Sequence, residues 1–216
     1  MTAAALPSPP PAAELEPAVE TWKVGEPLVR IYEGRWGPLG FNPTSSAGRF
    51  RPIHDAGSVV PTAYAANDEE TAFAEVLLRG VDALSGGNLP RLYRKEVDGI
   101  EMVRLIPKRE LRLARLNGTG LTRLKLLRSQ MIDLYPPNYP YTAAWAQALY
   151  DCPTELDGIS WTSRQNDSGR AVILWQGPVD PQQDLEEDGD PIELDSEPGL
   201  ELVRQAAVTA GFAFSG

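Results

Sequence analysis

The spacing of hydrophobic residues along the chain predicts several short strands. In residues 28–34, LVRIYEG, Val29 and Ile31 fall on one face and Arg30 falls on the other, as in a half-buried strand. The stretch that follows, residues 35–50, is rich in glycine, proline and serine and predicts a loop. Further strands are predicted at residues 62–66, 100–107, 159–163 and 171–175.

Helical patterns lie between these strands. A helix is predicted over residues 68–79, with Asn67 as its N-cap and Glu70 at the third helical position. Other helices are predicted at 119–134, at 142–151 with Thr142 as the cap, and at 200–211. In the 119–134 helix we expect Leu124, Leu127 and Met131 in the core and Arg123, Lys125 and Arg128 on a solvated face. Strands and helices mixed without regular βαβ units predict an α+β fold.

The two ends of the chain differ from its middle. Residues 1–20 are rich in proline and alanine and predict a disordered or extended tail. Residues 180–198 are acidic and rich in turn residues, so we expect a mobile surface segment there. The chain length of 216 residues favours one compact domain, over residues 21–216.

Charge and residue counts narrow the classes of function. The formal net charge of −10 disfavours direct binding to nucleic acid or to an anionic membrane surface. Cys152 and His54 are the only cysteine and histidine, which excludes a disulfide framework and a Cys/His zinc site, and no metal is expected. The sequence shows neither a long apolar run nor a signal-peptide pattern, so a cytoplasmic location is expected.

Glu75 stands out as a candidate for chemistry. From Thr71 to Leu78 all residues except Glu75 are apolar or threonine, so the predicted helix is hydrophobic nearly all round. A carboxylate buried there costs several kcal/mol unless a cationic or hydrogen-bonding partner meets it. The pattern alone does not decide between a functional partner for Glu75 and a simple i,i+4 ion pair between Glu75 and Arg79.

Four short motifs, in this order, resemble the RES domain, which is the toxin of bacterial RES–Xre toxin–antitoxin pairs. They are LVRIYEG at 28–34, GRF at 48–50, AYAANDEETAFAEV at 63–76 and LDGISWTS at 156–163. The resemblance covers about residues 27–176. It implies a mixed, ADP-ribosyltransferase-like sheet core flanked by helices, and an enzyme that breaks the nicotinamide–ribose bond of NAD+.

The resemblance also implies which residues act. Glu75, Arg30 and Ser163 take the catalytic roles, and NAD+ is bound by Arg30, Arg49, Tyr64 and Ser163. Guanidinium groups suit pyrophosphate because their planar forks pair with two phosphate oxygens. For Arg30 and Arg49 a salt bridge to Glu75 is the alternative role. The motif SWTS departs from the commonest family pattern before the serine, although Trp161 keeps its aromatic character.

Several functional alternatives share this site. The leading expectation is a toxin that depletes cellular NAD+ by hydrolysis, or by phosphorolysis with inorganic phosphate as co-substrate. The same site would serve a protein ADP-ribosyltransferase, and a non-catalytic interaction domain is the third alternative. The resemblance implies an Xre-type helix-turn-helix antitoxin as partner. The oligomeric state is open, and a homo-oligomer is compatible with the sequence.

Overall fold

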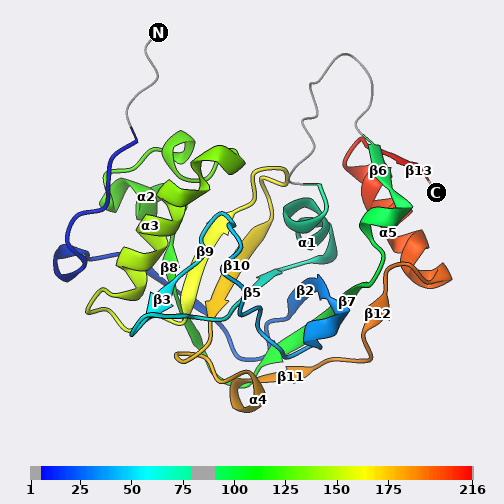
Figure 1. The fold of residues 1–216 in the computed structure, drawn as a ribbon, viewed down its shortest axis with the longest axis horizontal. Coiled ribbons are helices and arrows are strands. Elements are labelled where there is room, and N and C mark those ends of the chain that lie inside the picture. Colours follow the sequence, from blue (N-terminus) through cyan, green and yellow to red (C-terminus); the bar gives the residue numbers. More distant parts are fainter. Residues whose placement is uncertain (1–5, 79–90, 216) are drawn as a thin grey trace, which may run out of the picture.

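A curled, mixed sheet of nine strands organises the chain (Figure 1). The structure is a computed structural model, and it describes residues 6–78 and 91–215. All neighbouring strands of this sheet are antiparallel except β8 and β9, which are parallel. The strand order is β1 (Val19–Trp22), β8 (Leu111–Arg115), β9 (Gly158–Thr162), β10 (Arg170–Trp175), β5 (Thr62–Ala66), β2 (Leu28–Glu33), β7 (Ile100–Pro107) and β11 (Leu185–Glu187), with β12 (Ile192–Glu193) also paired to β7.

The helices gather on one face of the sheet. Directly paired residues point to the same side, so the pairs Ala171–Ala66 and Ala66–Val29 identify one continuous face. On this face α2 (Gly118–Arg123) and α3 (Tyr139–Tyr150) cover one end, while α1 (Glu69–Val76) and α5 (Glu197–Thr209) cover the other (Figure 1). On the opposite face, side chains of the sheet such as Trp22 and Leu185 form a second core cluster with Phe41 and Val179. The α+β class and the mixed sheet core flanked by helices are confirmed.

Strand β2 is more deeply buried than its alternating pattern predicts. Its first five residues are all buried, because β5 and β7 pair with it from both sides and both of its faces are covered. The strand is therefore central rather than half-buried. Arg30, paired with Val103, lies on the face opposite the helices.

The helix that carries Glu75 begins one residue later and ends earlier than predicted. Its N-cap is Asp68, whose carboxylate accepts from the Thr71 N–H, while Asn67 accepts from the Arg170 N–H of the adjacent strand. The regular helix ends at Val76. Arg79, the expected partner of Glu75 in the helical pair, lies outside the described residues.

The predicted helix over residues 119–134 is wrong. Helix α2 ends at Arg123, since Lys125 takes a left-handed conformation with φ of 58° that breaks the helix. The turn buries Leu126 and leaves Leu127 61% exposed. Met131 is buried as expected, but Arg128 belongs to a separate 3₁₀ turn, Arg128–Gln130.

Helix α3 also begins before the predicted residue. It starts at Tyr139, with Pro140 in its first turn, where the missing N–H costs nothing. Thr142 is therefore inside the helix rather than its cap. Its buried hydroxyl donates to the carbonyls of Tyr139 and Arg49.

The acidic segment is ordered, contrary to the expectation of a mobile region. It forms α4 (Pro181–Asp184), β11 and β12, and both strands pair with β7. Leu185 and Leu194 are buried and anchor it to the core. Charged side chains on a short edge strand are a common way to keep such an edge soluble.

The N-terminal lead-in and the C-terminal elements complete the domain. Residues 6–18 form no regular structure apart from a 3₁₀ turn, Ala12–Glu14, and Leu15 is buried against the α2–α3 end of the core. Strand β13 (Ala213–Ser215) follows α5 and pairs in parallel with β6 (Arg91–Tyr93). A small hairpin joins β3 (His54–Asp55) and β4 (Ser58–Val59).

Candidate functional site

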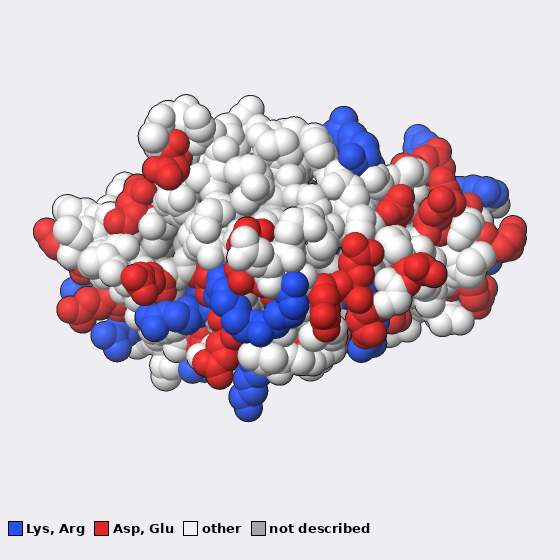
Figure 2. Space-filling model, turned by 90° about the horizontal axis from the view of Figure 1, so that it is seen from below, with Lys and Arg blue, Asp and Glu red and all other residues white. Residues whose placement is uncertain are grey.

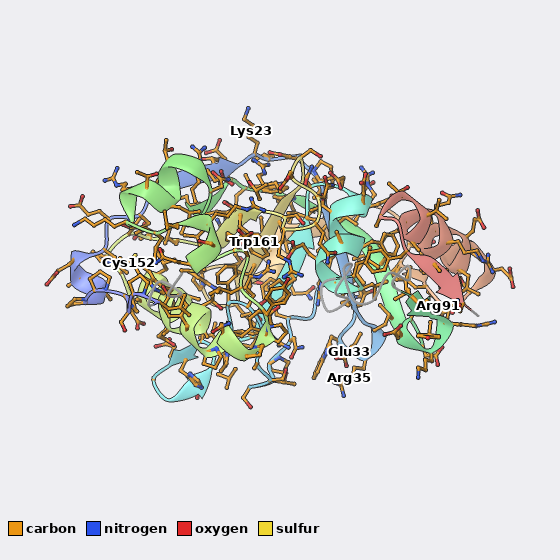
Figure 3. All side chains as sticks on the ribbon, turned by 90° about the horizontal axis from the view of Figure 1, so that it is seen from above. Lys23, Glu33, Arg35, Arg91, Cys152 and Trp161 are labelled. Carbon is orange, nitrogen blue, oxygen red and sulfur yellow. The ribbon has the colours of Figure 1, made fainter. Side chains whose placement is uncertain are left out.

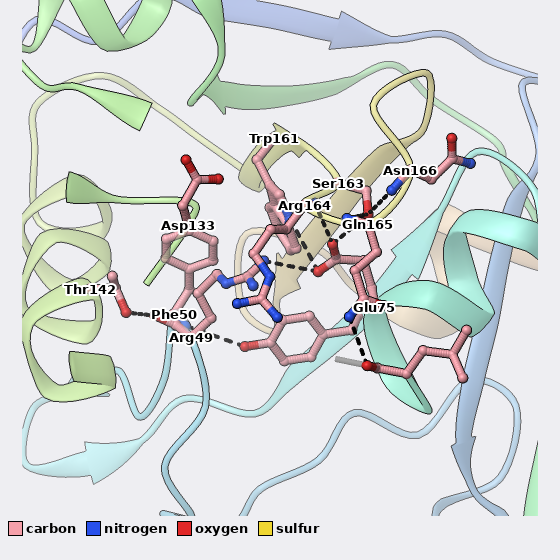
Figure 4. Close-up of polar contacts among 12 residues, drawn as sticks. Arg49, Phe50, Glu75, Asp133, Thr142, Trp161, Ser163, Arg164, Gln165 and Asn166 are labelled. Atoms are coloured by element: carbon pink, nitrogen blue, oxygen red, sulfur yellow. Dashed lines mark hydrogen bonds and ion pairs between the residues drawn. The ribbon is translucent and has the colours of Figure 1, made fainter. Parts of the chain in front are cut away.

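Glu75 lies at the centre of a buried hydrogen-bond network, seen in close-up in Figure 4. One carboxylate oxygen, Oε2, accepts from Arg49 Nη1 at 3.0 Å and from Trp161 Nε1 at 3.3 Å. The other, Oε1, accepts from Ser163 Oγ at 2.7 Å and from the Arg164 backbone N–H at 3.2 Å. Four donors and one positive charge thus offset the cost of burying this carboxylate.

The end of strand β9 supplies three of these donors. Trp161 is fully buried and makes an edge contact with Phe50, with ring centroids 5.0 Å apart. Figure 3 shows Trp161 near the middle of the molecule. Ser163 follows the strand, and its hydroxyl also accepts from the N–H groups of Gln165 and Asn166 at 3.3 Å. The Ser163 hydroxyl is thus fixed from both sides while it donates to Glu75.

The loop after Ser163 is tied to helix α1. Asn166 donates to the Thr71 hydroxyl at 3.0 Å, and Gln165 donates to the Leu78 carbonyl at 2.8 Å. Gly169 packs so closely that an added Cβ would lie 2.1 Å from Thr71 Oγ1. This loop and the helix that carries Glu75 therefore form one rigid unit.

Each residue of the motif GRF has a defined place. Phe50 is fully buried, and its N–H donates to the Tyr64 hydroxyl at 3.3 Å. A Cβ at Gly48 would lie 2.9 Å from the Arg51 side chain and 3.2 Å from the Tyr64 hydroxyl. Arg49 is 4% exposed and pairs with Glu75, so the salt bridge kept as the alternative for Arg49 is present. Its buried Nε has no hydrogen-bond partner among the described residues.

Arg30 does not join the Glu75 network. It is buried on the other face of the sheet and donates to the backbone carbonyls of Gly37, Pro38 and Gly40. Its guanidinium lies 4.6 Å from the centre of the Tyr32 ring. Burial lowers the pKa of Arg30 to about 10, so the side chain is still cationic at neutral pH. The salt bridge to Glu75 that was the alternative role for Arg30 is therefore not formed, because Arg30 donates to these backbone carbonyls.

A cavity of about 280 Å³ opens where strands β2 and β5 separate. The two strands pair only at Val29–Ala66, and beyond that point residues 31–33 and 62–64 diverge to form the walls. Arg30, Arg51 and Tyr64 line this cavity. Trp36 also lines it, and its buried indole N–H has no hydrogen-bond partner among the described residues.

Glu75 borders a much smaller cavity of about 10 Å³. Ile31, Tyr64 and Val76 line both cavities, so these side chains stand between the carboxylate and the larger one. The smaller void is close to the space that one water molecule needs. The site therefore consists of a fixed buried carboxylate and an adjacent open cavity, whose lining includes Arg30 and Arg51 as well as Glu33 and Glu96.

The structure thus brings together Arg49, Glu75 and Ser163, with Tyr64 beside them. Arg30 reaches the same region from the opposite face, through the split between β2 and β5. Sequence reasoning missed the direct contact of Trp161 with Glu75 and the contact of Thr142 with Arg49. The polar run SRQND after a buried strand was the only signal for the loop that holds Glu75.

Comparison with known proteins decides the family. The model of the RES domain matches residues 27–195. This chain belongs to the RES domain family. The match extends beyond the predicted end at residue 176 and includes the acidic segment, which is part of the sheet through β11 and β12.

A solved structure supports the fold of this RES domain protein. A chain of the crystal structure of the M. tuberculosis MbcT–MbcA toxin–antitoxin complex superposes with a TM-score of 0.61 at 16% sequence identity. The similarity covers 84% of this chain and 91% of that chain. Among curated protein sequences there is no match.

The surface and the remaining residues add further observations. On the face shown in Figure 2, basic side chains gather in the middle and acidic side chains flank them, so this face has no continuous basic field.

Within residues 6–78 and 91–215, no three His, Cys, Asp or Glu side chains are grouped so as to hold a metal ion. No helix in the described part of the chain has the length and apolar character needed to cross a membrane.

Proposed function

We propose that this RES domain protein is the toxin of a toxin–antitoxin pair and that it cleaves the nicotinamide–ribose bond of NAD+. The observation that carries the proposal is the Glu75 carboxylate, fixed by four donors beside a cavity that Arg30 and Arg51 help to line. A charge fixed in advance in a buried site stabilises a developing opposite charge more strongly than water does.

Glu75 is the group that meets the reacting sugar in this proposal. When the C1′–N bond breaks, the pyridinium nitrogen takes both electrons, nicotinamide leaves neutral and the ribose becomes oxocarbenium-like. A carboxylate beside the ring stabilises that positive charge and accepts a hydrogen bond from a ribose hydroxyl. Because Tyr64 and Val76 stand between Glu75 and the larger cavity, we expect them to shift when the nicotinamide end binds.

Two arginines in the lining of the larger cavity, Arg30 and Arg51, suit the pyrophosphate of NAD+. Arg30 lines the cavity, and the hydrogen bonds that it donates go to backbone carbonyls rather than to a carboxylate. A phosphate oxygen there would compensate a charge whose burial is costly. The unpartnered indole N–H of Trp36 fits the same interpretation, because Trp36 lines the cavity and a ligand acceptor would satisfy this donor. Arg49 Nε also lacks a partner among the described residues, but Arg49 lines neither cavity, so contact with phosphate requires a movement of the site.

Ser163 and Tyr64 have distinct roles in this proposal. The Ser163 hydroxyl is buried and fully engaged, so it acts by holding Glu75 rather than by attacking the substrate. Tyr64 lines both cavities and offers a flat ring on which nicotinamide can stack.

Product analysis tests the enzyme proposal. Purified, antitoxin-free protein is incubated with NAD+, with and without inorganic phosphate, and the products are separated by chromatography and identified by mass. Free ADP-ribose indicates hydrolysis, a phosphorylated ADP-ribose indicates phosphorolysis, and ADP-ribose attached to protein indicates transfer. An unchanged NAD+ pool under all conditions would refute the enzyme proposal.

The toxin proposal includes a cytoplasmic location and an Xre-type helix-turn-helix antitoxin. An unrestrained NAD+ consumer would deplete its own host, which makes an inhibitor necessary. We expect co-expression of the proposed helix-turn-helix antitoxin to restore growth, and the isolated complex to leave NAD+ intact. A complex as active as the free enzyme would contradict inhibition at this site.

A further inference from the structure

We infer that Arg128 is a positioning residue that holds Glu75 through a single peptide group, the one between Ser163 and Arg164. The inference rests on the proposed function, in which the Glu75 carboxylate meets the substrate. The sequence pattern placed Arg128 on a solvated helix face, but the structure puts its guanidinium against the loop that fixes Glu75.

Arg128 makes contacts on two sides of this loop. Its Nη2 donates to the Ser163 carbonyl at 2.9 Å and its Nε donates to Asp133 Oδ1 at 3.0 Å. Asp167 lies within 3.4 Å of the same Nη2. The Arg128 side chain is 37% exposed, so its charge is partly solvated while its guanidinium contacts the loop. A guanidinium fixed by Asp133 therefore holds the Ser163 carbonyl in one direction.

The peptide plane carries this constraint to the carboxylate. The bond between Ser163 and Arg164 is trans, and in a trans peptide the C=O and N–H groups point in opposite directions in one plane. Arg128 holds the carbonyl end of that plane, and the N–H end donates to Glu75 Oε1 at 3.2 Å. A rotation of the plane would move both ends together. Removing the guanidinium thus loosens one of the four donors of Glu75.

Other contacts keep the loop folded without Arg128. The Ser163 N–H donates to the Gly169 carbonyl at 2.9 Å, and Asn166 and Gln165 remain tied to helix α1. Arg128 lines neither cavity at the site. Its removal should therefore affect the orientation of Glu75 rather than the binding of substrate or the fold.

The test compares Arg128→Ala and Arg128→Lys with the matched control Arg123→Ala. Arg123 also donates to a backbone carbonyl and a carboxylate, both of Glu16, but lies away from the Glu75 network. We expect Arg128→Ala to lower kcat for NAD+ by about ten- to a hundred-fold with KM unchanged, because a small misplacement of a catalytic group costs that much. Lysine should restore part of kcat, and the Arg123 variant should match the wild type.

A second measurement does not depend on activity. In protein labelled with ¹⁵N-arginine, hydrogen exchange of the Arg164 amide should become at least about tenfold faster in Arg128→Ala than in wild type or Arg123→Ala, since its hydrogen bond opens more often. Unchanged exchange would overturn the inference even if the wild type proved inactive on NAD+. With an active wild type, an unchanged kcat or a loss confined to KM would overturn it and leave the proposed function intact.

Discussion

Arg49 and Glu75 form a buried ion pair with a nitrogen–oxygen distance of 3.0 Å, and their side chains are only 5% and 9% exposed. The pair joins the motif GRF to the helix that carries the proposed catalytic carboxylate. Because each charge is the main compensation for the other in a buried site, neither can be removed without a large effect. Stability and chemistry are thus coupled at this one contact.

Replacing Arg49 should separate these two effects. Arg49→Met leaves Glu75 buried without its cation, so we expect the free energy of unfolding to fall by about 3–5 kcal/mol in urea denaturation. Arg49→Lys keeps the charge and should recover much of this stability. It lacks the guanidinium fork proposed to reach phosphate, so its kcat/KM for NAD+ should still fall by about ten- to a hundred-fold.

The control for the stability measurement is Arg123→Met, which breaks an exposed ion pair with Glu16. Such pairs contribute about 1 kcal/mol or less. Equal losses in the Arg49 and Arg123 variants would contradict the importance of the buried pair. Wild-type efficiency in Arg49→Lys would remove phosphate contact from the role of Arg49.

Ser163→Ala should weaken both the loop and the position of Glu75. The change removes one donor to the carboxylate and the acceptor used by the Gln165 and Asn166 N–H groups. We expect a loss of about 1–3 kcal/mol in the free energy of unfolding, measured in urea, together with a lower kcat. Ser160 offers a matched control, because it is fully buried and its Oγ has no hydrogen-bond partner in the described part of the chain. A Ser160→Ala change that cost as much as Ser163→Ala would show that the Glu75 contact is not what matters.

The raised pKa of Tyr32 predicts how the free energy of unfolding changes at alkaline pH. Burial, followed by the hydrogen bond it donates to Glu101, raises the pKa of Tyr32 above its ordinary value of 10.0. The folded protein therefore keeps the phenol neutral where the unfolded chain ionises it, and this part of the stability is present below pH 10 and is lost as the pH rises above it. The free energy of unfolding should fall less steeply in Tyr32→Phe than in wild type between about pH 9 and 11.

Arg30 contributes with the opposite sign. Burial lowers the pKa of Arg30 to about 10, so its deprotonation in the folded state adds stability as the pH rises. Because the charge of Tyr32 raises the pKa of Arg30, its removal in Tyr32→Phe shifts the Arg30 contribution in the same direction as the predicted difference. Parallel pH profiles for wild type and Tyr32→Phe would contradict the shift at Tyr32. Urea denaturation at each pH supplies the profiles.

Local patterns drew attention to a residue of the candidate site where its burial was unusual. Glu75 was recognised because a lone carboxylate in an apolar helix needs partners, and Arg49 was among those considered. Ser163 and Tyr64 depended on the family resemblance, since serine and tyrosine are common in protein cores. These residues come together because β5 and β9, which are distant in sequence, are the two neighbours of β10 in the sheet.

Other features depended on tertiary contacts that no local pattern shows. The left-handed Lys125 turned an apparent amphipathic helix into a turn and placed Arg128 against the Ser163 carbonyl. The acidic segment became ordered because Leu185 and Leu194 reach the core and β7 offers a free edge. The cavity lies where β2 and β5 pair only at Val29–Ala66, a feature that no local motif predicted.

The rate of nicotinamide release by Glu75→Gln tests the central claim most directly. Glutamine keeps the size of the side chain but leaves the buried Arg49 without its counter-charge, so we expect a lower melting temperature than in wild type. Circular dichroism at the assay temperature identifies the folded protein on which the rate is measured. Glu70→Gln, on the exposed first turn of the same helix, is the control. We predict that Glu75→Gln abolishes nicotinamide release while Glu70→Gln retains the wild-type rate. A folded Glu75→Gln protein that releases nicotinamide at nearly the wild-type rate would contradict the catalytic role of Glu75.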